Sequence, residues 1–351
     1  MLLNELLKDT GEWLRGTGPD SEIVISSRVR LARNLQGFHF ISRLSPEERA
    51  ACETKIRKRI IEANIVLPER YLELQEADPT DRKLLVERHL ISKEHEDARH
   101  PRGVAIGAGE SLSIMINEED HIRLQVLRSG FCLREAFQMA QGFDLQLEEG
   151  LDFAFSPQLG YLTACPTNVG TGMRVSVMLH LPALVITRHI EKVFQAVSKI
   201  NLAVRGLYGE GTEASGHFYQ ISNQVTLGKT EEEIAANVEQ VIPTIVKYER
   251  DARESLMKRD RVRLEDRIWR ALGMLRAARV MSSDESMMML SFVRMGVHLG
   301  LLDKLSIKTV NELFIYSQPA HLQKLAQHIM QPEERDIRRA EYIRSRLNGK
   351  T

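Results

Sequence analysis

The stretch Ser26-Ser27-Arg28-Val29-Arg30 follows a short apolar segment and carries two arginines two residues apart. On a β-strand, side chains at that spacing point to the same face of a sheet. Other short segments are apolar or alternating and are bounded by Gly, Pro or Asn, and they lie at 112–117, 123–127, 161–165, 174–181 and 217–227. We expect all these segments to form strands of one sheet.

Helix signals separate the expected strands. Ser45-Pro46-Glu47-Glu48 and Thr230-Glu231-Glu232-Glu233 both have the form of a capping box. In this motif the first side chain caps the helix, and the glutamate three positions later returns the hydrogen bond. We therefore predict helices over about 46–64 and 230–249, and the periodicity of 187–202 predicts another.

After residue 250 the strand signals end. Apolar residues recur there at helical spacing between charged residues. Ser282-Ser283-Asp284-Glu285 and Thr309-Val310-Asn311-Glu312 each predict the start of a helix, and Pro319 and Pro332 occupy positions typical of a first helical turn. The sequence therefore predicts a mixed α and β part that is followed by an all-helical C-terminal domain.

Charge, cysteine content and hydropathy exclude several classes of protein. Lys plus Arg and Asp plus Glu number 48 each, so no overall field favours nucleic acid or an anionic membrane. The three cysteines lack metal-ligand spacing and indicate reduced thiols rather than a disulfide framework. No apolar run approaches the ~20 residues needed to cross a bilayer, and no signal-like segment opens the chain. We expect a cytoplasmic protein that does not bind membrane or nucleic acid directly.

Five arginines from four distant segments are suited to binding a triphosphate. They are Arg28, Arg30, Arg123, Arg174 and Arg205. A phosphoryl group that leaves ATP passes through a loose transition state, so catalysis depends on cations in fixed positions around the phosphate oxygens. Arginine serves better than lysine because its planar fork donates two parallel hydrogen bonds and stays charged. We expect these residues to bind ATP with Mg²⁺ bridging its phosphates, although any one arginine alone is more often part of a surface salt bridge.

A guanidinium acceptor would need carboxylates opposite these arginines. Such a group is protonated near neutral pH and has no free lone pair, so carboxylates must hold it and take a proton. Glu119, after an expected strand, and Glu210, in a glycine-flanked loop, are the candidates. We expect Glu118 to face the Mg²⁺ shell through water and Asp120 to cap a turn. A lone glutamate in a loop is otherwise usually a solvated charge.

The segment 165–174 combines a cysteine with a pair of glycines. Cys165 ends an expected apolar strand, where a lone cysteine is usually a small buried hydrophobe. Arginine neighbours would instead lower its pKa and give a thiolate that orients a cationic substrate. In Asn168-Val169-Gly170-Thr171-Gly172 the glycines either form a turn or let backbone amides approach a phosphate. Their spacing matches neither a Walker loop nor a dinucleotide-binding loop.

Together these segments resemble the phosphagen kinases, the ATP:guanidino phosphotransferases such as creatine and arginine kinases. The resemblance covers about residues 22–250 and rests on 26–30 with Arg33, 117–123, 165–174 and 205–223, where 209–213 looks closest to arginine kinases. It implies ATP-binding roles for Ser27, Arg28, Arg30, Arg123, Arg174, Met178 and Arg205. Met178 stands where many members have a histidine that contacts adenine. The resemblance also implies that Glu119, Glu210 and Cys165 hold the guanidino group, Cys165 being the reactive cysteine of the family.

The same resemblance implies a fold and a subfamily. It implies an α+β protein with a lead-in at 1–21, a catalytic domain at 22–254 that has an antiparallel sheet flanked by helices, and a helical domain at 255–351. Phosphagen kinases carry a helical domain before the first arginine motif, whereas only about 25 residues precede it here. A chain that lacks that domain and adds a helical tail is similar to the bacterial protein-arginine kinases. Those enzymes phosphorylate arginine side chains and mark proteins for degradation by Clp protease.

The tail contains the motif Arg335-Asp336-Ile337-Arg338-Arg339-Ala340. Arg335 and Arg339 share a helix face with Asp336 nearby. In protein-arginine kinases a similar motif is associated with phosphoarginine binding, while a solvated helix face is an equally good explanation of the pattern. As partners, the resemblance implies protein substrates that present arginine, such as unfolded proteins and a transcriptional repressor, an activator protein, the Clp protease machinery and a second copy of the chain.

Two other hypotheses stay open at this point. One is a phosphagen kinase for a small guanidino compound. The other is an inactive adaptor that binds arginine-phosphorylated proteins through the tail, and the presence of both Glu119 and Glu210 weighs against it.

Overall fold

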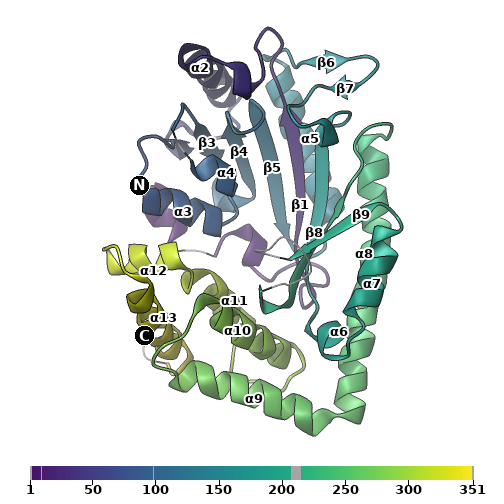
Figure 1. Ribbon diagram of the computed structural model, residues 1–351, viewed down its shortest axis with the longest axis vertical. Helices are drawn as coiled ribbons and strands as arrows, with labels where there is room; N and C mark the ends of the chain where they lie inside the picture. The colour runs from purple at the N-terminus through teal and green to yellow at the C-terminus, as the bar shows by residue number, and fades with distance from the viewer. Residues whose placement is uncertain (1, 9, 98, 207–214, 350–351) are drawn as a thin grey trace.

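A computed structural model describes residues 2–8, 10–97, 99–206 and 215–349. The strands in these residues are β1 (Val24–Arg33), β2 (Tyr71–Glu73), β3 (Gly103–Ile106), β4 (Leu112–Ile116), β5 (Ile122–Ser129), β6 (Phe155–Ser156), β7 (Gly160–Tyr161), β8 (Met173–His180), β9 (Leu202–Gly206) and β10 (Phe218–Asn223). Within this described part, eight strands form one antiparallel sheet in the order β2-β3-β4-β5-β1-β8-β10-β9 (Figure 1). The predicted α+β class with an antiparallel sheet is confirmed.

The helices flank the sheet and continue beyond it. They are α1 (Leu2–Leu6), α2 (Pro46–Glu62), α3 (Pro79–Glu87), α4 (Lys93–Glu96), α5 (Leu133–Glu148), α6 (Pro182–Ile186), α7 (Ile190–Ser198), α8 (Glu231–Arg259), α9 (Arg261–Ala277), α10 (Ser283–His298), α11 (Ile307–Tyr316), α12 (Pro319–Ala326) and α13 (Pro332–Leu347). In the described ranges, none of these helices combines the length and the apolar character that crossing a membrane requires.

One face of the sheet carries the arginines. Strand β1 lies between β5 and β8. Arg30 is opposite Arg174 in the β1/β8 pair, and Ala32 is opposite Arg123 in the β1/β5 pair. Directly paired residues point to the same side, so arginines from three strands share one face. The alternate residues of β1, such as Val29, are buried toward the other side, where α5 packs on β1 and β5 and α8 packs on β8 and β10.

Helices α9 to α13 gather at one end of the sheet (Figure 1). There α10 packs against the short turn Ser215–His217 that leads into β10, and α12 packs against α3. The Ser291 hydroxyl of α10 lies 2.8 Å from His180 Nε2 and 2.7 Å from His217 Nδ1. The buried Arg294 guanidinium donates to two backbone carbonyls just before β1, at 2.7 and 2.9 Å. The helical part is therefore joined to the sheet by buried polar contacts.

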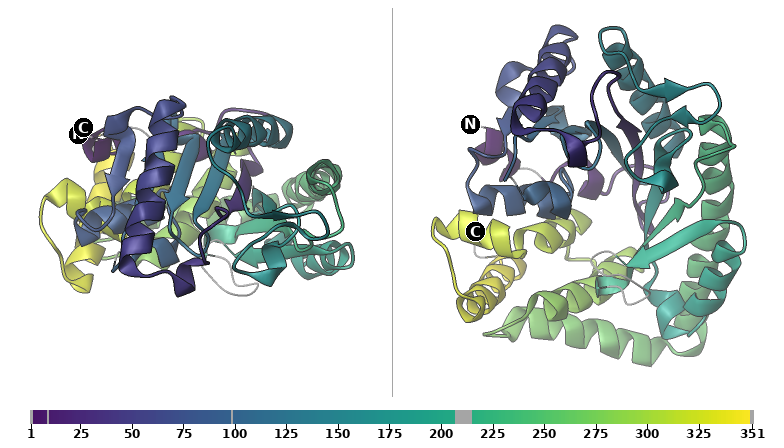
Figure 2. Two further views of the ribbon diagram at one scale, coloured as in Figure 1. Left: turned by 90° about the horizontal axis from the view of Figure 1, so that it is seen from above. Right: turned by 45° about the horizontal axis from the view of Figure 1, so that its top comes forward.

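Helix α8 is 29 residues long and connects the two parts. Figure 2 shows it along one edge of the molecule, from the sheet to the helical end. Its Glu249 accepts hydrogen bonds from the amides of Ala183 and Leu184 at 3.1 and 3.0 Å and pairs with Arg253. The predicted boundary between residues 254 and 255 falls inside α8, and the division into two domains stays a prediction.

Most predicted helix starts are confirmed. Ser45 and Thr230 form the predicted capping boxes, and α12 and α13 begin at their predicted prolines. The start predicted at Thr309 is wrong, because α11 begins earlier, at Ile307. Ser306 is the cap there, and its hydroxyl accepts a hydrogen bond from the Thr309 amide at 3.0 Å.

Two predictions about strands and helices are wrong. Residues 161–165 do not join the main sheet, because Gly160–Tyr161 pairs with Phe155–Ser156 in a separate hairpin. The helix expected over 187–202 ends at Ser198, and Leu202 instead begins the edge strand β9, which carries Arg205. The sequence of β9 is only five residues long and fits a helical and an extended period equally well.

Candidate active site

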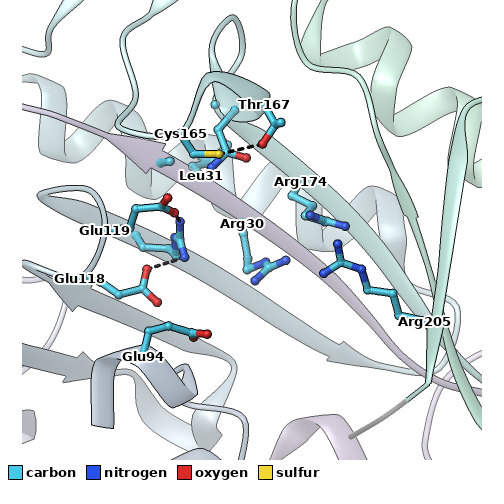
Figure 3. A pocket seen from close by; sticks show the side chains of 13 residues that line it. Arg30, Leu31, Glu94, Glu118, Glu119, Cys165, Thr167, Arg174 and Arg205 are labelled. Atoms are coloured by element: carbon cyan, nitrogen blue, oxygen red, sulfur yellow. Dashed lines mark hydrogen bonds and ion pairs between the residues drawn. The ribbon is translucent and has the colours of Figure 1, made fainter. Parts of the chain in front are cut away.

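A pocket of about 480 Å³ opens on the arginine face of the sheet. Its lining includes seven of the predicted site residues, namely Arg30, Glu118, Glu119, Arg123, Cys165, Arg174 and Arg205. In Figure 3, Arg30, Arg174 and Arg205 lie on one side of the pocket and Glu94, Glu118 and Glu119 lie on the other. The structure therefore brings cations and carboxylates from distant segments into opposite walls of one pocket.

Arg30, Arg174 and Arg205 on the basic wall form no ion pair with a carboxylate among the described residues. Arg30 Nε and Arg174 Nε are buried, and neither has a hydrogen-bond partner among the described residues. Arg174 Nη2 donates to Ser222 Oγ at 3.0 Å. Burial lowers the pKa of Arg30 and of Arg174, and the surrounding arginines lower both further. Clustered guanidinium groups with unused donors are suited to a polyanion such as a triphosphate.

Arg123 joins the basic wall to the acidic wall. It forms ion pairs with Glu118, with Glu119 at 2.8 Å and with Asp120 at 3.7 Å. Burial alone would lower the pKa of Arg123, but these carboxylates outweigh burial and raise it. Glu118 is buried and also accepts a hydrogen bond from the Ser92 hydroxyl, whereas the Glu119 side chain is 47% exposed. Glu119 is therefore the more accessible of these two carboxylates to a cation from solvent.

Arg28 and Met178 lie beside this pocket rather than in it. Both line a separate small cavity of about 20 Å³. Arg28 Nη2 donates to Gln220 Oε1 at 2.6 Å, and its Nε donates to Ser176 Oγ at 3.4 Å. Burial lowers the pKa of Arg28 to about 10, and the charge of Arg174 contributes. Arg28 thus belongs with Arg30 and Arg174 to one cluster of guanidinium groups whose positive charges repel one another.

The Ser27 side chain also lies outside the pocket. Ser27 alternates with Arg28 on β1, so its side chain lies on the opposite face. There the buried Ser27 hydroxyl donates to the Gly130 carbonyl at 2.9 Å and accepts from the Cys132 amide at 3.1 Å. Glu210 lies outside the described residues.

Cys165 faces the pocket from a loop and does not end a strand as predicted. It caps the 3₁₀ turn Pro166–Asn168, and its Sγ lies 3.0 Å from Thr167 Oγ1. The glycines that follow serve backbone packing. A Cβ on Gly170 would lie 2.4 Å from the Thr226 carbonyl oxygen, and the φ of Gly170 is +112°. This favours the turn interpretation for Gly170, while Gly172 lines the pocket.

Sequence reasoning missed the roles of two acidic residues. Asp120, expected to cap a turn, is fully buried, and its Oδ1 accepts from the Ala164 amide and from Asn34 Nδ2, both at 2.7 Å. Asp120 therefore positions the loop that carries Cys165. Glu94 of α4 lines the acidic wall, and no pattern in the sequence distinguishes it from other surface glutamates.

The motif at 335–340 lies on α13. Arg339 is buried, its Nε donates to the Ser317 carbonyl at 2.9 Å, and its Nη1 donates to the Met281 carbonyl at 2.8 Å. Arg339 also pairs with Asp336. Its guanidinium thus connects α13 to the chain just before α10, while Arg335 is partly exposed.

The fold and the pocket define a phosphotransferase that acts between ATP and a guanidino group. The family described as ATP:guanido phosphotransferase, C-terminal catalytic domain, matches residues 51–252. A duplicated taurocyamine kinase from Schistosoma mansoni, solved with transition state analog components, superposes with a TM-score of 0.60 at 28% identity, over 70% of this chain and 35% of that one. A lombricine kinase structure gives a TM-score of 0.57 at 25% identity, over 71% of this chain and 75% of that one.

Comparisons of the C-terminal part and of the whole chain identify a narrower family. The family described as protein-arginine kinase McsB C-terminal domain matches residues 261–351. The chain is 49% identical to a protein-arginine kinase of Symbiobacterium thermophilum over 99% of both chains. It is 43% identical to a protein-arginine kinase of Bacillus subtilis over 100% of this chain and 98% of the relative. The chain belongs to the protein-arginine kinase family within the ATP:guanido phosphotransferases.

Proposed function

We propose that this chain transfers the γ-phosphoryl group of ATP to arginine side chains of proteins. The observation that carries the proposal is one pocket with carboxylates on one wall and, on the other, guanidinium groups that have unused donors in the part of the chain that the structure describes. The names of the full-length relatives support the protein substrate.

The basic wall is proposed to hold the nucleotide. Arg30, Arg174 and Arg205 would donate to the phosphate oxygens, with Arg123 on the neighbouring strand β5 and Arg28 two residues before Arg30 on β1. The unused donors and lowered pKa values of Arg30 and Arg174 support this role, because a bound polyanion relieves their mutual repulsion. Fixed cations also stabilise the charge that develops on the phosphoryl oxygens during transfer. Met178 is proposed to border the adenine, and its place beside Arg28 supports this. The side chain of Ser27 is not available for the same purpose, since it is buried on the other face.

The acidic wall is proposed to hold the acceptor arginine. Glu119 would exchange its partner Arg123 for the substrate guanidinium, and Glu210 would grip a second nitrogen and share in accepting the proton. A substrate nitrogen then attacks the γ-phosphorus, the bond from phosphorus to the bridging oxygen breaks, and ADP leaves. Cys165, on the rim beside both walls, would orient the guanidinium. The exposure of Glu119 supports its role as the first contact.

Magnesium is proposed to enter as part of the nucleotide complex. In the residues that the structure describes, no group of three or more His, Cys, Asp or Glu side chains could hold a metal ion. The phosphates would therefore supply the direct ligands, and Glu118 would contact the ion through water. The position of Glu118 on the pocket wall supports this assignment.

Regulatory and cellular roles are proposed from the family resemblance. They comprise phosphoarginine binding by Arg335, Asp336 and Arg339, activation by another protein, modification of a transcriptional repressor, and marking of proteins for Clp protease in the cytoplasm. Because Arg339 is buried against two carbonyls, its part would be to hold Asp336 in place. A homodimer through the helical domain is supported by the exposed Val262 and Trp269, which are seven residues apart on α9.

Mass spectrometry under non-acidic conditions tests the function. An unfolded protein and free arginine are each incubated with enzyme and Mg-ATP, and phosphoarginine is measured. We expect labelling of the protein and its loss in Glu119→Gln. Exclusive labelling of free arginine would support a small-molecule phosphagen kinase instead. An inactive protein that still bound phosphoarginine would support an adaptor.

A further inference from the structure

A second pocket, which the proposed reaction does not use, lies next to the candidate active site. Its volume is about 650 Å³. The loop 167–172 borders both pockets, since Thr167 and Asn168 line the first while Gly170 and Thr171 line the second. The second pocket lies on the α5 side of the sheet and the first on the arginine side, so a chain that occupied both would cross this loop.

The polar lining of the second pocket is acidic. Asp144, Glu148 and Glu231 line it, and Lys229 is the cation among its lining residues. The buried Arg33 guanidinium forms ion pairs with Asp144 at 2.7 Å and with Glu231 at 3.2 Å. Burial raises the pKa of Glu231, and the charge of Asp144 adds to that rise. Three carboxylates against two cations leave a negative charge in this pocket.

Apolar side chains surround the carboxylates. Leu145 of α5 and Phe155 of β6 line the pocket and are 61% and 57% exposed, and Leu159 and Leu227 beside them are also exposed. Large apolar side chains that gather at an exposed site usually mark a surface for binding. Glu148 lies on α5 three residues after Leu145, so the two share one helix face.

We propose that the second pocket binds a cationic, apolar segment of an unfolded polypeptide whose nearby arginine is phosphorylated in the first pocket. The proposal rests on the protein-arginine kinase function. Its support is charge complementarity, because the excess of carboxylates attracts lysine and arginine side chains. The apolar rim favours an unfolded chain, since a folded protein buries the side chains that would fit it. The shared loop places both contacts within one continuous segment of substrate.

Other occupants fit the chemistry less well. The carboxylates repel an anionic ligand such as a nucleotide. A metal ion lacks a suitable group of three ligating side chains in the described ranges. The combination of negative charge and exposed leucines matches a peptide that is both basic and apolar.

A matched pair of double variants tests the proposal. Leu145→Ser with Glu148→Lys changes the second pocket, and Leu67→Ser with Glu69→Lys makes the same changes outside the linings of both pockets, where Leu67 is 58% exposed. The substrates are an unfolded, lysine-rich protein with one arginine and a short glycine-flanked arginine peptide. For the pocket variant we expect KM for the unfolded protein to rise about tenfold, because the loss of one buried leucine contact weakens binding by about that factor. The kcat and the KM for the short peptide should not change, and the control variant should resemble the wild type.

A binding measurement makes the test independent of turnover. A fluorescent peptide of alternating lysine and leucine contains no arginine, so it binds without being phosphorylated. Its anisotropy should report binding to the wild type and to the control variant, and about tenfold weaker binding to the pocket variant. Circular dichroism checks that both variants are folded. Equal KM and equal peptide affinity for the two variants would overturn the second-pocket proposal alone. A wild type that forms no phosphoarginine on either substrate would overturn the proposed function as well.

Discussion

Replacing Arg28 by methionine should stabilise the protein without nucleotide and weaken its binding of ATP. Burial, together with the charge of Arg174, lowers the pKa of Arg28 from its usual 12.5 to about 10. At about 1.36 kcal/mol for each pH unit, this corresponds to about 3 kcal/mol. The folded-state pKa lies below the unfolded-state pKa, so at pH 7 the side chain is charged in both states and the folded state carries the whole cost.

The lost hydrogen bonds reduce this gain. Arg28 donates to Gln220 at 2.6 Å and, more weakly, to Ser176 at 3.4 Å. Removing a hydrogen bond from a charged donor costs about 1.5–3 kcal/mol. Methionine has a similar length and retains most of the apolar packing of the arginine stem. The net stabilisation should therefore be about 1 kcal/mol, which raises Tm by about 1–2 °C for a chain of 351 residues.

Thermal unfolding with and without Mg-ATP measures both effects. We expect a higher Tm for Arg28→Met in buffer and a smaller increase on addition of Mg-ATP, because one cation of the nucleotide site is gone. Arg263→Met is the control, since that side chain is 87% exposed, and it should leave both values unchanged. A lower Tm in buffer, or an undiminished response to Mg-ATP, would refute the reasoning.

Three further predictions concern activity, packing and pH. Glu119→Gln should slow arginine phosphorylation about a hundredfold or more. It should change stability by less than about 1 kcal/mol, because the Glu119 side chain is 47% exposed; a wild-type rate would remove Glu119 from the mechanism. Arg339→Ala should lower the free energy of unfolding by about 3 kcal/mol, because it leaves two buried carbonyls without donors. Denaturant unfolding measures this change, and a loss below about 1 kcal/mol would contradict the prediction. Burial lowers the pKa of His217 from 6.5 to about 4, so its contribution to stability is complete above pH 6.5 and is lost as pH falls toward 4. His217→Gln should flatten the fall of Tm over that range, and parallel curves would count against the assignment.

Local signals in the sequence predicted the elements whose ends are set by nearby side chains. The capping boxes at Ser45 and Thr230 act within four residues, so the sequence alone locates the starts of α2 and α8. The edge strand β9 could not be found in this way. Its extended form depends on pairing with β10, where Arg205 is opposite Gln220. That contact joins separate segments of the chain and has no local pattern.

The same limit applies to the site. Alternation along a strand was enough to place Arg28 and Arg30 on one face, but the partners of each arginine depend on the packed structure. The sequence does not show that Arg174 and Arg339 differ in their hydrogen-bond partners. One has a buried Nε without a partner among the described residues, while the other donates to the carbonyls of Ser317 and Met281. Periodicity tells which residues share a face and not what covers that face.

The contacts between α10 and the sheet have a consequence for how the protein melts. Ser291 lies between His180 and His217, and Asn311 donates to the Leu14 carbonyl at 3.0 Å, so each part satisfies buried polar groups of the other. Separating the parts would leave those groups without partners at a newly wetted surface. The sheet and the helical part should therefore unfold as one cooperative unit. Calorimetry should show a single endotherm whose van't Hoff enthalpy equals its calorimetric enthalpy.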